Sequence, residues 1–248
     1  MQQVAHAQSA RGEIYLGRRV DGSLELRVNG VFVMDTVETS SEHLLATLAL
    51  DALPGRSAAG SGHCPAAPVE VSVLVAGLGL GFTLREVLRH PAVTRVMVSE
   101  IEPDLVAWHR DGVIPPPGGD MSTGGLLADP RVGGLLADPR VEVEVGDVRV
   151  VVTDLPAGSV DVIILDVDNG PGFLVYDTNA DVYGEEFLSR CAAALTSPGV
   201  VAVWSADRSN ALLTSMRGLF GRVDERAVPV RLGRRLTTYH VVLGHRLP

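Results

Sequence analysis

The chain has 248 residues, enough for one large α/β domain with a small appendage, and 46% of them are hydrophobic, which is ample for a buried core. Its net charge of −9 and its aromatic content of 4% argue against nucleic acid or an anionic membrane as the main partner. All 21 basic residues are arginines, so neither a lysine Schiff base nor a P-loop lysine can form on this chain.

The first quarter of the chain predicts a small β unit followed by a helix. Residues 13–34 alternate apolar and polar side chains, and Asp21-Gly22 and Asn29-Gly30 are strong hairpin signals, so we expect two or three antiparallel strands. The stretch SSEHLLATLALDALPG then reads as a helix that begins at a serine cap and ends before Pro-Gly. The expected division is an N-terminal β unit with its helix over 1–53, a Gly/Pro-rich flexible linker over 54–68 and the main domain over 69–248.

From residue 69 onward, strands and helices alternate. The predicted strands, nearly all apolar, cover 70–76, 93–100, 141–147, 160–166 and 199–205. The predicted helices between and after them cover 81–90, 102–110, 147–155, 184–195 and 207–220. This pattern is typical of a parallel sheet covered on both faces, and the last thirty residues predict two further strands, the last of them antiparallel.

A tandem repeat interrupts this pattern. GGLLADPRV at 124–132 is followed at once by an identical copy at 133–141. One extra copy is too few for a solenoid, and a duplication tolerated in a surface loop explains it, because lengthening a loop costs little. We expect the second copy to lie directly before the strand, because it continues into VEVEVGD.

Cysteine usage and the chain ends bear on the compartment. Cys64 and Cys191 lie far apart and outside any CxxC motif, which predicts a reducing environment. The N-terminus lacks a signal-peptide layout, and no apolar run has the length of a membrane span. We therefore expect a cytoplasmic protein, with a homodimer left open.

The stretch VLVAGLGLGFTL predicts a strand that turns sharply into a helix. Its glycines follow a GxGxG spacing at Gly77, Gly79 and Gly81, with Phe82 at the last position of the dinucleotide fingerprint GxGxxG. This spacing favours a nucleoside without phosphates, such as S-adenosylmethionine, over NAD. A glycine-rich turn without a ligand is the alternative.

Acidic residues follow the next strands at the edge of the sheet where ligands bind. Glu100 ends one strand and suits the two ribose hydroxyls, and Asp147 follows the next strand and suits an adenine amino group. The predicted nucleoside-binding set comprises Gly77, Leu78, Gly79, Leu80, Gly81, Glu100, Ile101, Asp147 and Val148.

Two further acids, Asp166 and Asp168, follow the fourth strand of the main domain. Paired carboxylates push one pKa upward, and such a pair could hold a substrate ammonium and take a proton from it. The nitrogen would then attack a carbon bonded to the sulfonium. The alternative is that Asp166 caps a loop and Asp168-Asn169-Gly170 is turn chemistry. Tyr176, in the loop beyond, could border the substrate.

Other chemistries find little support in the sequence. The histidines show no HxH or HxxxH spacing, so we expect no metal site. Ser205 lacks the GxSxG context of a hydrolase nucleophile.

The stretches VLVAGLGLGFTLREVLRHPAVTRVMVSEIEPDLV, ADPRVEVEVGDVR and VDVIILDV together resemble the spermidine synthases. This resemblance implies a Rossmann-like class I methyltransferase fold with a mostly parallel seven-stranded sheet, helices on both faces and a small N-terminal β-hairpin unit. It also implies an aminopropyltransferase of polyamine biosynthesis. By family pattern Glu100 would bind ribose, Asp147 adenine, and Asp166 would be the catalytic acid.

Three positions depart from the family pattern. The family's GGGDG turn has an acid where this chain has Leu80, its YHE corresponds to Ser40-Ser41-Glu42, and its DxxD is one residue shorter as Asp166-Val167-Asp168. All three changes fall on parts that recognise amines.

We therefore expect a transferase that uses S-adenosylmethionine or its decarboxylated form as co-substrate and an amine acceptor. The predicted catalytic residues are Asp166 and Asp168, and the predicted substrate-binding residues are Glu42, Asn169 and Tyr176. Two alternatives stay open: a small-molecule methyltransferase, and an inactive relative that acts as a binding protein.

Overall fold

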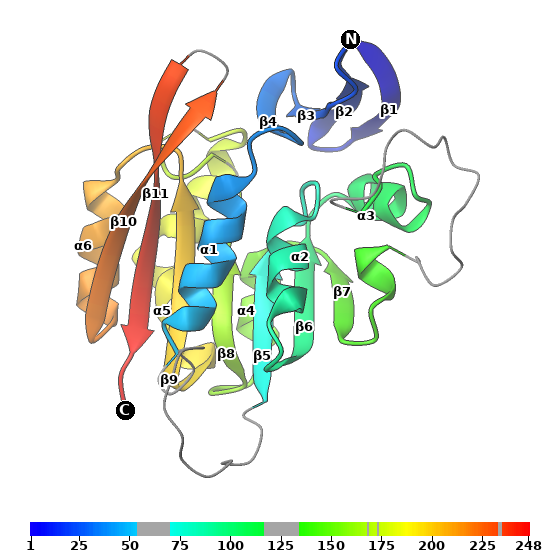
Figure 1. The fold of residues 1–248 in the computed structure, drawn as a ribbon. Helices are drawn as coiled ribbons and strands as arrows, with labels where there is room; N and C mark the ends of the chain where they lie inside the picture. The colour runs from blue at the N-terminus through cyan, green and yellow to red at the C-terminus, as the bar shows by residue number, and fades with distance from the viewer. Residues whose placement is uncertain (54–69, 117–133, 168, 173, 233–234) are drawn as a thin grey trace, which may run out of the picture.

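The computed structural model describes residues 1–53, 70–116, 134–167, 169–172, 174–232 and 235–248. These ranges form two sheets, a small antiparallel one at the N-terminus and a larger one that carries the rest of the chain (Figure 1). The expected linker over 54–68 lies outside the described residues.

The N-terminal sheet has four strands in the order β1-β2-β3-β4, each antiparallel to its neighbours. The strands are β1 Gln2–Ser9, β2 Gly12–Arg18, β3 Leu24–Val28 and β4 Val31–Asp35. Asn29 and Gly30 both have positive φ, 51° and 75°, and Val28 pairs with Val31, which makes the two-residue hairpin that the sequence predicted. β1 was not expected, so the prediction of two or three strands fell short by one.

The larger sheet has seven strands, as predicted, in the order β10-β11-β9-β8-β5-β6-β7. Its strands are β5 Val71–Ala76, β6 Val93–Glu100, β7 Val141–Val145, β8 Val160–Leu165, β9 Leu195–Ser205, β10 Arg222–Leu232 and β11 Arg235–Arg246. The five neighbouring strands β9, β8, β5, β6 and β7 are parallel to one another. Strand β11 is antiparallel to both β9 and β10.

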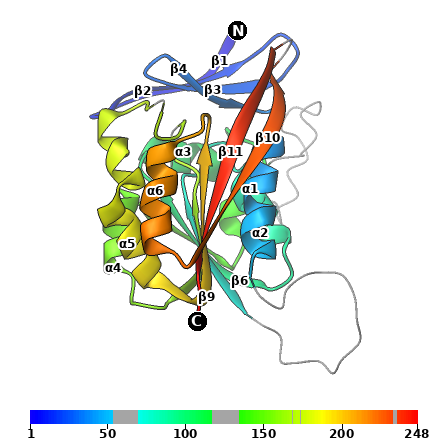
Figure 2. The same ribbon diagram turned by 90° about the vertical axis from the view of Figure 1, so that its left-hand side faces the viewer.

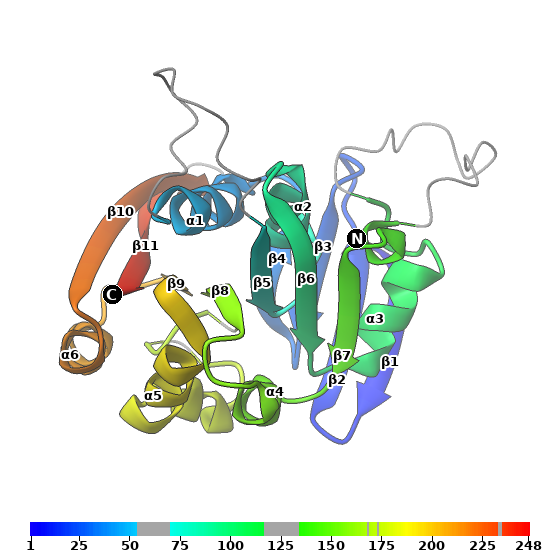
Figure 3. The same cartoon turned by 90° about the horizontal axis from the view of Figure 1, so that it is seen from below.

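Helices cover both faces of this sheet. They are α1 Ser40–Asp51, α2 Phe82–Arg89, α3 Pro103–Arg110, α4 Val148–Asp154, α5 Glu185–Ala194 and α6 Asn210–Leu219, with the short helices η1 Leu135–Ala137 and η2 Asp177–Tyr183. Figures 2 and 3 show α1 and α2 on one face and α4, α5 and α6 on the other.

Each face has its own apolar core because successive strand residues point to opposite sides. In β5, Val73 and Val75 belong to the core under α1, α2 and α3, and Leu74 and Ala76 belong to the core under α4, α5 and α6. Helix α1 contributes Leu45 among others to the first core, so it packs on the main sheet although it precedes the expected linker.

A third core joins the N-terminal sheet to the main domain. Leu16 and Leu26 of the small sheet pack with Leu80, Phe82 and Leu105 from the segments around α2 and α3. The small sheet is thereby held over the carboxyl ends of the parallel strands, where Figure 1 shows it above β5 and β6.

The second copy of the tandem repeat forms the segment directly before β7. It contains η1, and its Arg140 pairs with Asp138 and donates to the carbonyl oxygens of Leu88 at 3.0 Å and Val93 at 3.2 Å. The second copy therefore lies directly before the strand, as expected, and it also connects the start of β7 to the end of α2. The first copy lies outside the described residues.

Within the described ranges, no helix is long and apolar enough to cross a membrane, and no cluster of three potential metal ligands occurs.

Candidate active site

A pocket lies between the carboxyl ends of the parallel strands and the N-terminal sheet. The main domain contributes the ends of β5, β6, β7, β8 and β9, and the small sheet contributes an apolar wall that includes Leu26, Val28, Phe32 and Met34. The pocket thus lies at the edge of the sheet where ligands of open parallel sheets bind.

The glycine turn forms part of the pocket floor. Gly77, Gly79 and Gly81 have φ values of 89°, 50° and 86°, which disfavour any residue with a side chain. A Cβ at Gly77 would lie 2.1 Å from the backbone carbonyl oxygen of Asp166, so the turn and the end of β8 approach too closely for a larger residue. Gly77 and Gly79 line the pocket, while Gly81 lies at the start of α2.

A buried histidine forms a hydrogen bond to the backbone of the glycine turn. Nε2 of His109, on α3, lies 2.8 Å from the carbonyl oxygen of Gly79, which can only accept, so His109 donates here. Burial lowers the pKa of His109 below its usual value. A neutral ring with its proton on Nε2 therefore fixes the middle of the glycine turn.

The leucines of the turn point away from the pocket. Leu78 belongs to the core under α1 and α2. Leu80 is 1% exposed and packs in the core beneath the N-terminal sheet, where its N–H contacts the sulfur of Met34 at 3.2 Å. Neither leucine lines the pocket, so of the predicted nucleoside-binding residues in the turn only Gly77 and Gly79 do.

Glu100 ends β6 in a buried position, 6% exposed, and lines the pocket together with Ile101. One carboxylate oxygen accepts the N–H of Leu78 at 2.8 Å, and the other accepts the N–H of Glu102 at 2.9 Å. Burial raises the pKa of Glu100, and the backbone donors oppose that rise. A carboxylate offers about four acceptor positions, so about two remain for a ligand.

Asp147 caps the N-terminus of α4, where it accepts the N–H of Arg149 at 2.9 Å. The Arg149 guanidinium also binds both of its oxygens and holds the pKa of Asp147 below its usual range. Arg149 reaches on to Asp181 in η2 at 2.7 Å. Asp147 and Val148, both predicted to bind the nucleoside, line the pocket. The pairing of Asp147 with Arg149 had no signal in the sequence.

Asp166 follows β8 and faces the pocket. Thr83, in the first turn of α2, donates to it at 2.6 Å. Burial raises the pKa of Asp166 to about 6, although the Thr83 hydrogen bond favours the ionised form. A carboxylate poised at this pKa can accept a proton near neutral pH.

Glu42 enters the pocket from the first turn of α1 and is 8% exposed. The Ser41 hydroxyl donates to it at 2.6 Å. Burial, followed by the negative charge of Asp166, raises the pKa of Glu42 to about 7. The two carboxylates, 124 positions apart in the sequence, therefore share one electrostatic environment.

The loop after β8 holds the remaining predicted residues. Tyr176 lines the pocket, and its hydroxyl donates to Glu102 at 3.4 Å. Asn169 is buried and donates to the carbonyl oxygen of Phe32 at 3.4 Å, so it connects the loop to the N-terminal sheet. Asp168 lies outside the described residues.

Several residues that line the pocket were not predicted from the sequence. These are Asp35, Glu38, Glu102, Arg149, Trp204 and Tyr239. Only Glu102 had a local signal, because it lies two residues after Glu100 at the end of the same strand. The others come from the end of β4, the β4–α1 connection, α4, β9 and β11, which the fold brings together from distant parts of the chain.

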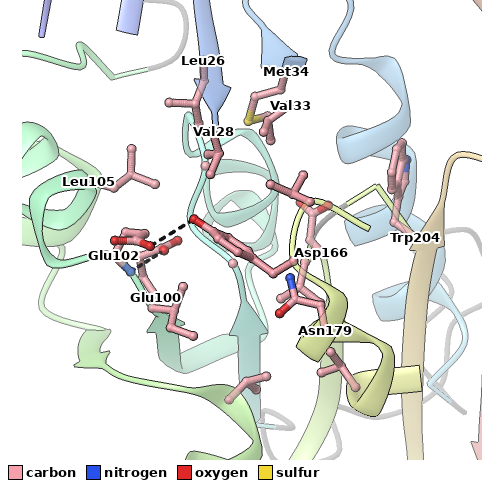
Figure 4. Close-up of a pocket in the computed structure, with 18 of the residues that line it drawn as sticks. Leu26, Val28, Val33, Met34, Glu100, Glu102, Leu105, Asp166, Asn179 and Trp204 are labelled. Atoms are coloured by element: carbon pink, nitrogen blue, oxygen red, sulfur yellow. Dashed lines mark hydrogen bonds between the residues drawn. The ribbon is translucent and has the colours of Figure 1, made fainter. Parts of the chain in front are cut away.

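The pocket is strongly acidic. Its acidic lining residues are Asp35, Glu38, Glu42, Glu100, Glu102, Asp147 and Asp166. Its one basic lining residue among the described positions, Arg149, is paired with Asp147 and Asp181. Figure 4 shows Glu100 and Glu102 on one side and Asp166 and Trp204 on the other. The arrangement fits an elongated ligand with hydroxyl groups at one end and positive charge at the other.

Known proteins share both sequence features and fold with this chain. A model of the spermine/spermidine synthase domain family matches residues 62–216. A comparison with curated proteins found no match.

Three solved structures resemble the chain over almost its whole length. The spermidine synthase from Thermotoga maritima is 18% identical, with a TM-score of 0.72 over 99% of this chain and 73% of that chain. A spermidine synthase in complex with the transition state analogue AdoDATO is 19% identical, with a TM-score of 0.74 over 99% and 74%. A probable spermidine synthase from Corynebacterium glutamicum ATCC 13032 is 20% identical, with a TM-score of 0.64 over 97% and 79%. At these identities the structures establish a common fold.

Proposed function

Because the chain belongs to the spermine/spermidine synthase domain family and is therefore a transferase, we propose that it moves an aminopropyl group from decarboxylated S-adenosylmethionine to an amine acceptor. The nucleoside would occupy the side of the pocket at Glu100 and Asp147, and transfer would occur at Asp166.

The observation that carries this proposal is the unbalanced charge of the pocket. Of its seven acids, Asp147 pairs with Arg149 and Asp35 with Arg19, while the other five have no basic partner among the described residues. Decarboxylated S-adenosylmethionine carries two positive charges, on sulfur and on the terminal amine. The intact form adds a carboxylate, which these acids would repel.

The position of Leu80 is consistent with this choice. The family's acid at this point of the turn is absent, but the Leu80 side chain is buried in the core under the N-terminal sheet and leaves the pocket charge to other residues. Glu42, Glu38 and Asp166 supply negative charge from the opposite wall. Glu42 is therefore proposed to hold the donor amine, which leaves Asp166 and Glu38 for the acceptor.

Asp166 is the proposed proton acceptor. The acceptor arrives as an ammonium ion, and its proton passes to the Asp166 carboxylate, which frees the nitrogen lone pair. The nitrogen then forms a bond to the aminopropyl CH₂ that carries the sulfonium, and the carbon–sulfur bond breaks with its electron pair going to sulfur. The products are a neutral methylthio-nucleoside and an elongated amine. The contribution of the chain is alignment and deprotonation.

The acceptor is proposed to be a linear aliphatic amine with a second positive centre. Trp204 and Tyr239 meet edge to face, with ring centroids 4.8 Å apart, and both line the pocket beside the acids. Aromatic faces favour both methylene chains and cations. Glu38, on the connection between β4 and α1, supports a second ammonium because the described residues give it no basic partner.

Titration calorimetry with the two donors tests the proposal. Decarboxylated S-adenosylmethionine should bind at least about tenfold more tightly than the intact form, because a carboxylate placed among unpaired acids costs more than one hydrogen bond. Tighter binding of the intact form would contradict aminopropyl transfer and favour methyl transfer. If neither donor binds at millimolar concentration, the transferase proposal for this pocket fails.

A further inference from the structure

Glu102 is a buried carboxylate with an unmatched oxygen. It follows β6, occupies the residue before α3 and is 4% exposed. Its Oε2 has no hydrogen-bond partner among the described residues. Its Oε1 has only two long contacts, from the hydroxyl of Tyr176 at 3.4 Å and from that of Ser9 at 3.5 Å.

Such an arrangement is unfavourable for a buried carboxylate. Buried carboxylates normally pair with a cation or accept several short hydrogen bonds, because burial removes the water that solvates their charge. Glu102 has neither, and no basic side chain pairs with it in the part of the chain that is described. Glu102 lines the pocket, so a bound molecule can donate a hydrogen bond to its carboxylate.

The neighbouring carboxylate shows which donor is expected. Both oxygens of Glu100 already accept backbone N–H groups, from Leu78 and from Glu102 itself. Figure 4 shows Glu100 and Glu102 side by side, across the pocket from Asp166. A ribose carries two adjacent hydroxyl donors, and two adjacent carboxylates match that pair.

We infer that Glu102 is a second ribose-binding carboxylate, which accepts a hydrogen bond from one ribose hydroxyl while Glu100 accepts one from the other. This inference rests on the proposed nucleoside-binding function. Its consequence is specificity: a site that commits a buried carboxylate to one hydroxyl rejects a nucleoside that lacks it.

A binding experiment with neutral nucleosides isolates this contact. The probes are 5′-methylthioadenosine and its 2′-deoxy and 3′-deoxy analogues, because none carries a positive charge that would respond to the acids in general. Calorimetry on the wild-type protein should show about 10-fold to 100-fold weaker binding for each deoxy analogue. Glu102→Ala should weaken the binding of 5′-methylthioadenosine by a similar factor.

The distinguishing result is the pattern across analogues. For one of the two deoxy analogues, Glu102→Ala should cause little additional loss, because the hydroxyl that Glu102 accepts is already missing. Glu102→Gln, which keeps the shape and one neutral acceptor, should fall between wild type and alanine. Glu144→Ala, at an exposed acid in β7, is the matched control and should leave all three affinities unchanged.

Two outcomes would overturn the inference in different ways. If both Glu102 variants lower the affinity for all three nucleosides by one common factor, or lower none of them, Glu102 contacts no ribose hydroxyl. The proposed function would then stand without this contact. If the wild-type protein binds none of the nucleosides at millimolar concentration, the proposed function fails together with this inference.

Discussion

Asp166 is the proposed proton acceptor, so its protonation state bears directly on the proposed reaction. Its pKa of about 6 leaves it mostly ionised at neutral pH, with Thr83 holding one oxygen. Asp166→Asn keeps the shape of the side chain but removes the proton acceptor. We expect kcat to fall by at least about 100-fold, while the Kd of 5′-methylthioadenosine changes by less than about threefold.

Steady-state kinetics and calorimetry on the same preparation check this split. Asp154→Asn, at an exposed position near the end of α4, is the matched control and should behave as wild type. A kcat of Asp166→Asn close to that of wild type would show that Asp166 is not the proton acceptor.

Glu42 gives a prediction for stability against pH. Its pKa of about 7 lies above the ordinary value of 4.5, so between these values the folded chain binds more protons than the unfolded chain. Stability is therefore lost as pH rises through about 7, and ionised Glu42 costs on the order of 2 to 3 kcal/mol at pH 8. Glu42→Gln should remove that cost.

Thermal unfolding at pH 5 and pH 8 measures the effect. We expect Glu42→Gln to raise the Tm by about 5–10 °C at pH 8 and by much less at pH 5. Glu144→Gln, at an exposed acid, should change the Tm little at either pH. An equal Tm change at both pH values would mean that Glu42 does not ionise across this range.

Residues of the site were predictable where they follow a strand. Glu100, Asp147 and Asp166 come at the ends of apolar runs, and parallel strands bring such ends together. Trp204 and Tyr239 could not be found in this way, because only the pairing of β9 with β11 brings them together. The burial of the Leu80 side chain beneath the N-terminal sheet could not be predicted either, since it depends on how that sheet docks.

At the scale of elements, the second repeat copy is held by one arginine. The Arg140 guanidinium donates to two main-chain carbonyls, at the end of α2 and the start of β6. Arg140→Ala leaves those carbonyls without a donor, so we expect a loss of about 1–3 kcal/mol and a Tm lower by roughly 2–10 °C.

Arg95→Ala is the matched control, because Arg95 forms an exposed pair with Glu142 in the same region. Exposed pairs contribute about 0–1 kcal/mol, so its Tm should stay within a few degrees of wild type. Equal effects of the two substitutions would show that the Arg140 contacts do not hold the segment.

Elements with a strong period were predicted well, and weakly patterned ones were not. The apolar run of β5 and the helical spacing of α5 fall within about a residue of their predicted bounds. β1, with the sequence QQVAHAQS, has few β-branched residues and no turn signal of its own, and its pairing with β2 defines it. Tertiary context therefore supplied what local propensity lacked.

At the scale of the whole molecule, the pocket lies between two sheets that also meet through a shared apolar core. A ligand that contacts both walls stabilises the folded chain by mass action. At 100 times its Kd, 5′-methylthioadenosine should add about 2.7 kcal/mol and raise the Tm by about 5–10 °C.

A thermal-shift titration checks this expectation. The Tm should keep rising with the logarithm of ligand concentration, and adenine alone should give a smaller shift. A Tm that does not respond to 5′-methylthioadenosine would show that the pocket does not bind it in the folded state.

The unpaired acids of the pocket also bear on how a turnover ends. The proposed aminopropyl transfer would remove the sulfonium charge from the nucleoside, so the neutral methylthio product would lose its attraction to the pocket. The elongated amine would keep the donor's ammonium in addition to its own positive centres, so the same carboxylates would hold it longer. On the proposed function we therefore expect departure of the amine to be the slow step, and we expect added salt, which screens these charges, to speed it.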